Sequence, residues 1–153
     1  MPQKLLLALS LLAQPAAAHE FTLGALTIGH PYAAETPPGA MTGAGYLTIA
    51  NAGPEADRLI AVRADFPNVS LHRTEAGADG VVRMRESEGV AVPAGGEVAL
   101  APGGDHVMFM GLAGDPFEVG ERIPAVLVFE NAGEVAVEFV VEPRTAAGDH
   151  AGH

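Results

Sequence analysis

Histidine and methionine are the residues of this 153-residue sequence whose types and spacing could support chemistry. Besides the initiator, the chain has four methionines, and three of them stand in short apolar segments close to histidine. His106 and Met108 are two residues apart, and His72 and Met84 lie in the segments before them. Imidazole nitrogen and thioether sulfur both bind metals, so these four residues form a candidate metal site.

The donor types indicate which metal this would be. Thioethers are soft, neutral ligands that suit Cu(I), and imidazole suits copper generally. Zinc would favour Cys, His or carboxylate ligands. The chain contains no cysteine, which excludes a thiolate nucleophile, a redox dithiol and a blue-copper electron-transfer centre. We therefore expect a Cu(I) site whose ligands cannot be lost to disulfide formation in an oxidising compartment.

Strand geometry can bring the four side chains together. His106 and Met108 share one face of a strand, about 6.6 Å apart along it, because side chains alternate between the two faces. If the segments NVSLHRTE and GVVRMRES form a hairpin that turns around residues 76–80, His72 and Met84 lie nearly opposite each other on one face. Val107 and Phe109 would then point into the core.

The rest of the sequence predicts strands. Short apolar or alternating runs are separated by Gly, Pro, Asn and Asp, and glycine and proline are too frequent for a long helix. Many short strands at this spacing predict one all-β domain, an antiparallel β-sandwich or barrel. The predicted strands are 21–29, 45–51, 58–64, 69–74, 81–86, 97–100, 106–112, 123–129 and 135–142.

Two terminal segments are predicted to lie outside this domain. Residues 1–18 carry one early cation, an apolar run and a closing Ala16-Ala17-Ala18, which is typical of a cleaved signal peptide. The apolar run is too short to span a bilayer, so we expect an exported, not membrane-spanning protein. The metal-binding domain is expected at 19–143, followed by a flexible tail at 144–153.

Charge and motifs exclude several functions. The formal net charge is -11, which repels nucleic acid and anionic lipid and mildly attracts cations. No Ser-His-Asp arrangement, paired-carboxylate site or Gly-rich phosphate loop is present. We therefore expect no nucleic-acid partner and no enzyme activity.

The spacing of the four candidate ligands resembles that of the periplasmic copper chaperones called PCuAC. Their pattern is His, an optional Met, ten residues, Met, twenty-one residues and His-x-Met, and it is met here by His72, Met84, His106 and Met108. Arg73 stands where the optional Met can occur. The similarity extends from LGALTIGHPYA through GAGYLTIANAG to HVMFMGL and the closing VEF segment.

This resemblance implies a cupredoxin-like β-sandwich that binds Cu(I) through two His and two Met in the periplasm. It also implies delivery of copper for assembly of respiratory cytochrome oxidase, through transient contact with the oxidase or its assembly factors. Some members bind Cu(II) through His- or Met-bearing extensions, so His150 and His153 are candidates for Cu(II) binding.

Two other functions stay open from the sequence. A Cu(II)-binding protein or copper enzyme would use the α-amine and ring of His19, the expected mature N-terminus. A structural or adhesive β-sandwich would carry its methionines as core filler and its histidines as surface residues.

Several further residues receive weaker predictions. Met110 continues the face of Met108 and either lines the site or packs at its rim, and Met41 either reaches the site or caps the core. His30 is expected to be a structural turn residue. Three arginines are expected on a solvated strand face, with contact to a partner protein as the alternative: Arg73, Arg83 and Arg85.

Overall fold

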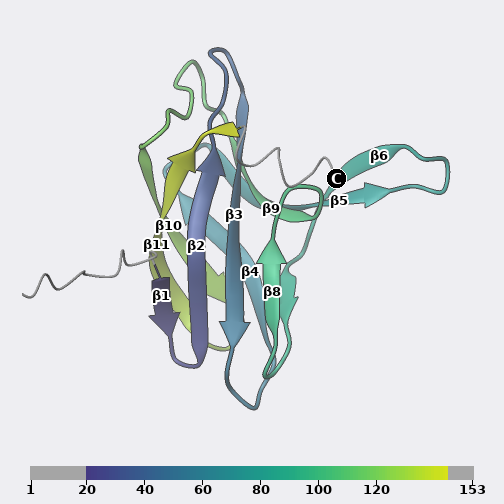
Figure 1. The fold of residues 1–153 in the computed structure, drawn as a ribbon, viewed down its shortest axis with the longest axis vertical. Coiled ribbons are helices and arrows are strands. Elements are labelled where there is room, and N and C mark those ends of the chain that lie inside the picture. Colours follow the sequence, from purple (N-terminus) through teal and green to yellow (C-terminus); the bar gives the residue numbers. More distant parts are fainter. Residues whose placement is uncertain (1–19, 145–153) are drawn as a thin grey trace, which may run out of the picture.

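The computed structural model of this chain describes residues 20–144, which form a β-sandwich (Figure 1). The predicted signal peptide at 1–18, His19 and the tail beyond Arg144 lie outside the described residues. Within residues 20–144, no helix has the length and apolarity needed to cross a membrane. The strands are β1 (Glu20–Leu23), β2 (Leu26–Ala34), β3 (Thr42–Asn51), β4 (Asp57–Ala64), β5 (Asn68–Ala76), β6 (Val82–Glu86), β7 (Val90–Val92), β8 (Glu97–Leu100), β9 (Asp105–Met110), β10 (Arg122–Phe129) and β11 (Gly133–Glu142).

The strands follow one hydrogen-bonded path that folds over a common core. Its order is β6-β5-β9-β3-β2-β11-β10-β4-β7, with β1 attached to β2 and β8 attached to β3. The neighbours pair antiparallel, as expected, except that β11 runs parallel to β2. This order places β9 between β5 and β3, although both of these strands come well before β9 in the sequence.

Alternating side chains build the core, as β11 illustrates. Val137, Phe139 and Val141 are buried, while the residues between them are less buried or exposed. At the centre, the Phe109 ring packs edge-on against Phe117 and Phe139 with ring centroids 5.6 and 5.5 Å apart. Each such aromatic pair contributes about 0.5–1.5 kcal/mol beyond the area it buries.

Most of the predicted strands are confirmed, with two differences. The run at 21–29 is not one strand, because Gly24 adopts a positive φ of 58° and turns the chain between β1 and β2. β7 has only three residues and was not predicted. Strand 97–100 is found with its predicted bounds.

His30 lies at a bulge inside β2 rather than in a turn between strands. Its φ is 44°, and the register of β2 against β3 shifts between Gly29 and Tyr32. The His30 Nε2 atom lies 2.8 Å from an oxygen of Glu142, so the ring is held by β11.

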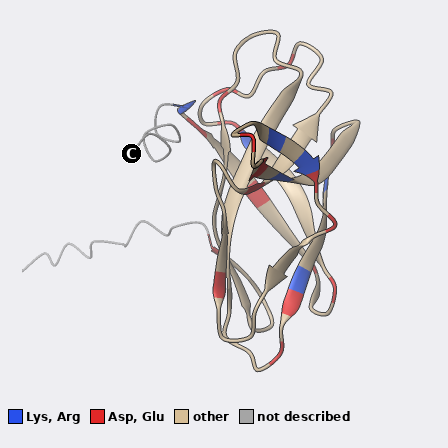
Figure 2. Ribbon diagram, turned by 90° about the vertical axis from the view of Figure 1, so that its right-hand side faces the viewer, with Lys and Arg blue, Asp and Glu red and all other residues tan. Residues whose placement is uncertain are grey.

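Acidic residues are spread over the ribbon, whereas basic residues are few, and a group of them lies on the β5–β6 hairpin (Figure 2). Three arginines there form ion pairs with carboxylates: Arg73 with Asp105 at 2.9 Å, Arg83 with Asp79 at 3.0 Å and Arg85 with Glu75 at 3.5 Å. All three side chains are about half exposed or more, as expected for a solvated strand face, and contact with a partner protein stays the alternative.

Gly43 marks the closest approach between β3 and the aromatic core. A Cβ atom at this position would collide with the Phe117 ring. We expect Gly43→Ala to lower the free energy of unfolding by about 1–3 kcal/mol, as overpacking does in a well-packed core. Urea unfolding followed by circular dichroism measures this change.

Gly104→Ala is the matched control. A Cβ there would meet only the Ala101 carbonyl oxygen, at an ordinary contact distance of 3.6 Å. This variant should stay within about 0.5 kcal/mol of the wild type. Equal destabilisation of the two variants would contradict the role given to Gly43.

Candidate metal centre

The candidate ligands lie on one face of three neighbouring strands. In the β5–β9 pairing, His72 is directly opposite His106. Directly paired residues share a face, and alternation places Met108 on this face as well. Val107 and Phe109 point to the other side and are fully buried, as expected.

The register arranges this face in rows across β5, β9 and β3. One row contains Ser70, Met108 and Ala44. Because serine and alanine are small, space remains around the Met108 thioether.

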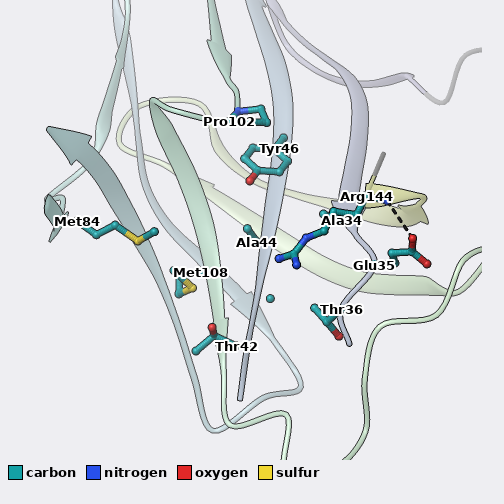
Figure 3. A pocket seen from close by; sticks show the side chains of 11 residues that line it. Ala34, Glu35, Thr36, Thr42, Ala44, Tyr46, Met84, Pro102, Met108 and Arg144 are labelled. Atoms are coloured by element: carbon teal, nitrogen blue, oxygen red, sulfur yellow. Dashed lines mark hydrogen bonds between the residues drawn. The ribbon is translucent and has the colours of Figure 1, made fainter. Parts of the chain in front are cut away.

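Met84 and Met108 line the same pocket, which has a volume of about 330 Å³. In Figure 3 the Met84 side chain reaches from β6 toward Met108, and Tyr46 and Ala44 stand on β3 to the right of them. Met84 is 60% exposed, whereas Met108 is half-buried. One thioether therefore belongs to the central strands and the other to an exposed hairpin.

The position of Met84 differs from the predicted hairpin by two residues. His72 lies opposite Glu86, and Met84 lies opposite Thr74. The loop begins one residue later than expected, because Ala76 still pairs with Val82 and the Gly77 N–H donates to the Val81 carbonyl at 2.9 Å. An even shift leaves every side chain on its face, so Met84 and His72 still share one side as diagonal neighbours.

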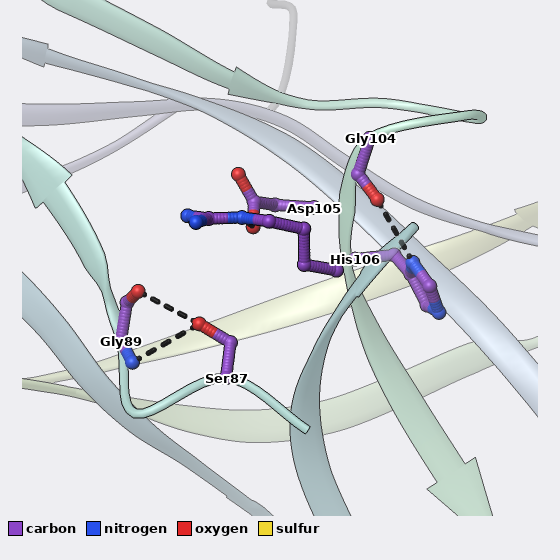
Figure 4. Close-up of polar contacts among 6 residues, drawn as sticks. Ser87, Gly89, Gly104, Asp105 and His106 are labelled. Atoms are coloured by element: carbon purple, nitrogen blue, oxygen red, sulfur yellow. Dashed lines mark hydrogen bonds and ion pairs between the residues drawn. The ribbon is translucent and has the colours of Figure 1, made fainter. Parts of the chain in front are cut away.

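The two histidine rings stack, with centroids 5.9 Å apart and an interplanar angle of 21°. The His106 Nδ1 atom lies 3.2 Å from the Gly104 carbonyl oxygen (Figure 4). A carbonyl can only accept, so Nδ1 carries the proton and Nε2 keeps its lone pair. The Ser70 hydroxyl contacts Nδ1 of His72 at 3.3 Å, and when it accepts the Nδ1 proton the Nε2 lone pair of His72 is free as well. Such outer contacts orient imidazoles for metal binding.

His106 is held in the neutral form that a metal requires. It is only 5% exposed. Burial, with a smaller effect of the neighbouring His72, lowers the pKa of His106 below its ordinary value of 6.5, against the opposing effects of the Gly104 hydrogen bond and Asp105. A neutral imidazole can donate a lone pair without first losing a proton.

Met110 and Met41 lie beyond this cluster. Met110 shares the face of Met108, and its sulfur lies 3.6 Å from the Asn68 side-chain nitrogen. Met41 is 63% exposed, and its carbonyl accepts the N–H groups of Gly111 and Leu112. Met110 thus lies in the next row of this face, between Asn68 and Thr42, and Met41 supports the end of β9 through its backbone. His19, His150 and His153 lie outside the described residues.

Sequence reasoning missed Ser70 and Tyr46. Ser70 stands two residues before His72, so strand parity alone could have placed it on the same face. The Tyr46 ring lies 6.5 Å from the His106 ring, which results from the β3–β9 pairing and has no local signal in the sequence.

Two imidazoles and two thioethers on one face of a β-sandwich define the class of this protein as a domain with a candidate site for a soft metal ion. The profile of the family described as "Putative lipoprotein LpqE-like" matches residues 26–141. The apo PCuAC domain from PmoF1 is 30% identical, with a TM-score of 0.70, over 82% of this chain and 99% of that chain. The chain therefore belongs to the LpqE-like family and to the PCuAC domains, which confirms the resemblance and its cupredoxin-like β-sandwich.

Other similar proteins agree with this family. The copper-bound PCuAC domain from PmoF2 is 32% identical, with a TM-score of 0.68, over 82% of this chain and 98% of that one. CuI-DR1885 from Deinococcus radiodurans is 27% identical, with a TM-score of 0.60, over 85% of each chain. "Putative lipoprotein Lxx21020" of Leifsonia xyli subsp. xyli (strain CTCB07) is 34% identical over 84 residues, and the match spans about half the length of both proteins.

The environment of His106 predicts a pH dependence of stability in the metal-free protein. Because its folded-state pKa is lowered, the unfolded chain binds more protons just below the ordinary pKa. The His106 contribution should be complete above about pH 6.5 and be lost as the pH falls through the folded-state pKa. Urea unfolding across this range measures it. A His106→Gln variant should show a shallower pH slope, and an identical slope in both proteins would contradict the assignment.

Proposed function

We propose that this protein is a copper chaperone that binds one Cu(I) through His72, Met84, His106 and Met108. The observation that carries the proposal is the pairing of His72 with His106 on the sheet face that also presents both thioethers. The copper-bound PmoF2 domain and CuI-DR1885 support copper as the metal, and the latter supports its Cu(I) state.

The donor set suits the transport of copper better than catalysis. All four ligands are neutral, so they stabilise Cu(I) without compensating its charge, and the ion stays exchangeable. His106 is nearly buried while Met84 is largely exposed on the hairpin. A recipient that approaches from the hairpin side would meet Met84 first and could replace it with a ligand of its own. We propose no enzymatic role.

The destination and compartment follow from the family resemblance. We propose that residues 1–18 direct export to the periplasm and that the protein delivers copper for assembly of cytochrome oxidase copper centres, by transient contact with the oxidase or its assembly factors. The word lipoprotein in the names of the matching family and of the Leifsonia relative supports export. The tail histidines His150 and His153 are proposed as an accessory Cu(II) site.

Anaerobic Cu(I) titration combined with X-ray absorption tests the site. Wild-type protein should bind one Cu(I) with two sulfur and two nitrogen ligands. Met84→Ala and Met108→Ala should each remove one sulfur ligand, and the double variant should weaken binding by more than ~100-fold, beyond what loss of an outer contact costs. Met110→Ala is the matched control and should retain both sulfurs. Wild-type affinity in the double variant would contradict the proposal.

The alternative at His19 is separated by one extra residue placed before it in the mature chain. Cu(I) binding should be unchanged by this addition if the sheet holds the metal. A collapse of Cu(II) binding, with turnover of an oxidisable substrate by the unmodified chain, would favour the alternative.

Ser70 should act by orienting His72. Removal of its hydroxyl in Ser70→Ala frees Nδ1 of the ring, and we expect Cu(I) affinity to fall about tenfold, the lower range for an outer-shell contact. Competition with a chromophoric Cu(I) chelator measures the change. Ser87→Ala is the control, because the Ser87 hydroxyl bonds only the Gly89 backbone. Equal affinities in the two variants would show that Ser70 does not position His72.

A further inference from the structure

The pocket at the candidate metal centre contains a cationic side chain, Arg144, that is not one of the four proposed ligands. Arg144 follows β11, and its side chain turns into the pocket over Ala44, on the side facing Met108 (Figure 3). Its charge acts on Tyr46, where it opposes the rise in pKa that burial causes. Arg144 therefore lines the same pocket as the proposed ligands Met84 and Met108.

The Arg144 guanidinium has no carboxylate partner in the described part of the chain. Five of the seven arginines there form ion pairs: Arg63, Arg73, Arg83, Arg85 and Arg122. Glu35 lines the same pocket, but its carboxylate accepts the backbone N–H of Arg144 at 3.1 Å rather than pairing with the guanidinium. The planar fork of the guanidinium can thus receive an external anion.

Neutral hydroxyl groups accompany this cation. Tyr46, Thr42 and Thr36 line the pocket. The Thr36 oxygen accepts the Phe117 N–H at 2.8 Å, which leaves its own O–H to donate. Burial raises the pKa of Tyr46, so its phenol stays protonated and can donate as well. The pocket therefore offers hydrogen-bond donors around a fixed positive charge.

Charge balance determines when an anion would bind. Arg144 and Glu35 cancel in the metal-free pocket, and the four proposed ligands are all neutral. One Cu(I) adds one positive charge, which a single monoanion neutralises. This step depends on the proposed copper site, whereas the guanidinium fork is present with or without metal.

We propose that the pocket binds a carboxylate beside the metal and that the carboxylate and Cu(I) strengthen each other's binding. A carboxylate matches the guanidinium fork with two parallel hydrogen bonds. It is a hard ligand that suits Cu(I) poorly, so it acts as a counter-ion held by Arg144 rather than as a fifth ligand. The carboxylate is either a small free anion or an Asp or Glu side chain of a recipient protein.

The acidic surface lowers the affinity of this site for anions. A net charge of -11 repels anions, so binding to the metal-free protein should be weak. Added copper charge should strengthen acetate binding by about tenfold, within the usual range of coupling between two sites. Because coupling is reciprocal, saturating acetate should raise Cu(I) affinity by the same factor.

The experiment titrates sodium acetate into the full mature chain, metal-free and Cu(I)-loaded, at constant ionic strength under anaerobic conditions. Amide NMR shifts of Thr42, Gly43 and Ala44 report binding, and chelator competition reports Cu(I) affinity. Acetamide is the neutral control ligand. Arg58→Gln is the matched control variant, because it removes one positive charge and Arg58 does not line the pocket.

Arg144→Gln should abolish the response to acetate while Arg58→Gln retains it. Without acetate, Arg144→Gln should bind Cu(I) at least as tightly as wild type, because a like charge near the metal is gone. A purely structural role for Arg144 predicts the opposite, weaker Cu(I) binding. Saturable shifts with acetamide, or an equal response to acetate in Arg144→Gln and wild type, would overturn the proposal.

The measurements distinguish failure of the copper-site proposal from failure of the carboxylate proposal. If Cu(I) binds as proposed but acetate changes neither the shifts nor the affinity, only the carboxylate site is wrong. If Cu(I) does not bind, the chaperone proposal and the coupling both fail, and the metal-free titration still decides the Arg144 site. A capped Ala-Asp-Ala peptide, with Ala-Asn-Ala as control, distinguishes the sources: tighter binding than acetate indicates a protein carboxylate, and weaker binding a free anion.

Discussion

The candidate centre depends on the register of β9 between β5 and β3. Val107 and Phe109 are fully buried on one side of β9, so a slip by one residue would expose them and bury Met108 and Met110. The packing of Phe109 against Phe117 and Phe139 therefore holds the donor atoms in place. The aromatic core therefore determines which side chains of β9 face the pocket. Few interactions on the pocket side are needed to keep this register.

The proposed ligands differ in how firmly the fold holds them. His106 is nearly buried and is oriented by the Gly104 carbonyl, and His72 stacks on it from the adjacent strand. Met84 is exposed on the β5–β6 hairpin, at the edge of the hydrogen-bonded path. Such a gradient suits a protein that must hold a metal and also release it, because one ligand can leave without disturbance of the core.

The charge around the proposed ligands is a second property that would affect metal binding. The chain is acidic overall, yet the pocket carries Arg144 beside the neutral thioethers of Met84 and Met108. Copper would bring positive charge next to this guanidinium, and a carboxylate would offset it. The proposed chaperone function and the proposed carboxylate site thus describe one pocket in which metal occupancy and an anionic group on a recipient can be linked.

The sequence by itself determined the all-β fold class, most strand positions and the shared faces, because side-chain alternation and turn residues are local properties. It indicated His72, Met84, His106 and Met108 through donor chemistry and family spacing, and their role as ligands stays a prediction. Tertiary structure decided the rest. The Gly77–Val81 loop moved Met84 opposite Thr74, and the β3–β9 pairing brought Tyr46 to His106. The path of the chain after β11 placed Arg144 in the pocket. These contacts join residues far apart in the sequence, and only the packing of the whole sheet fixes them.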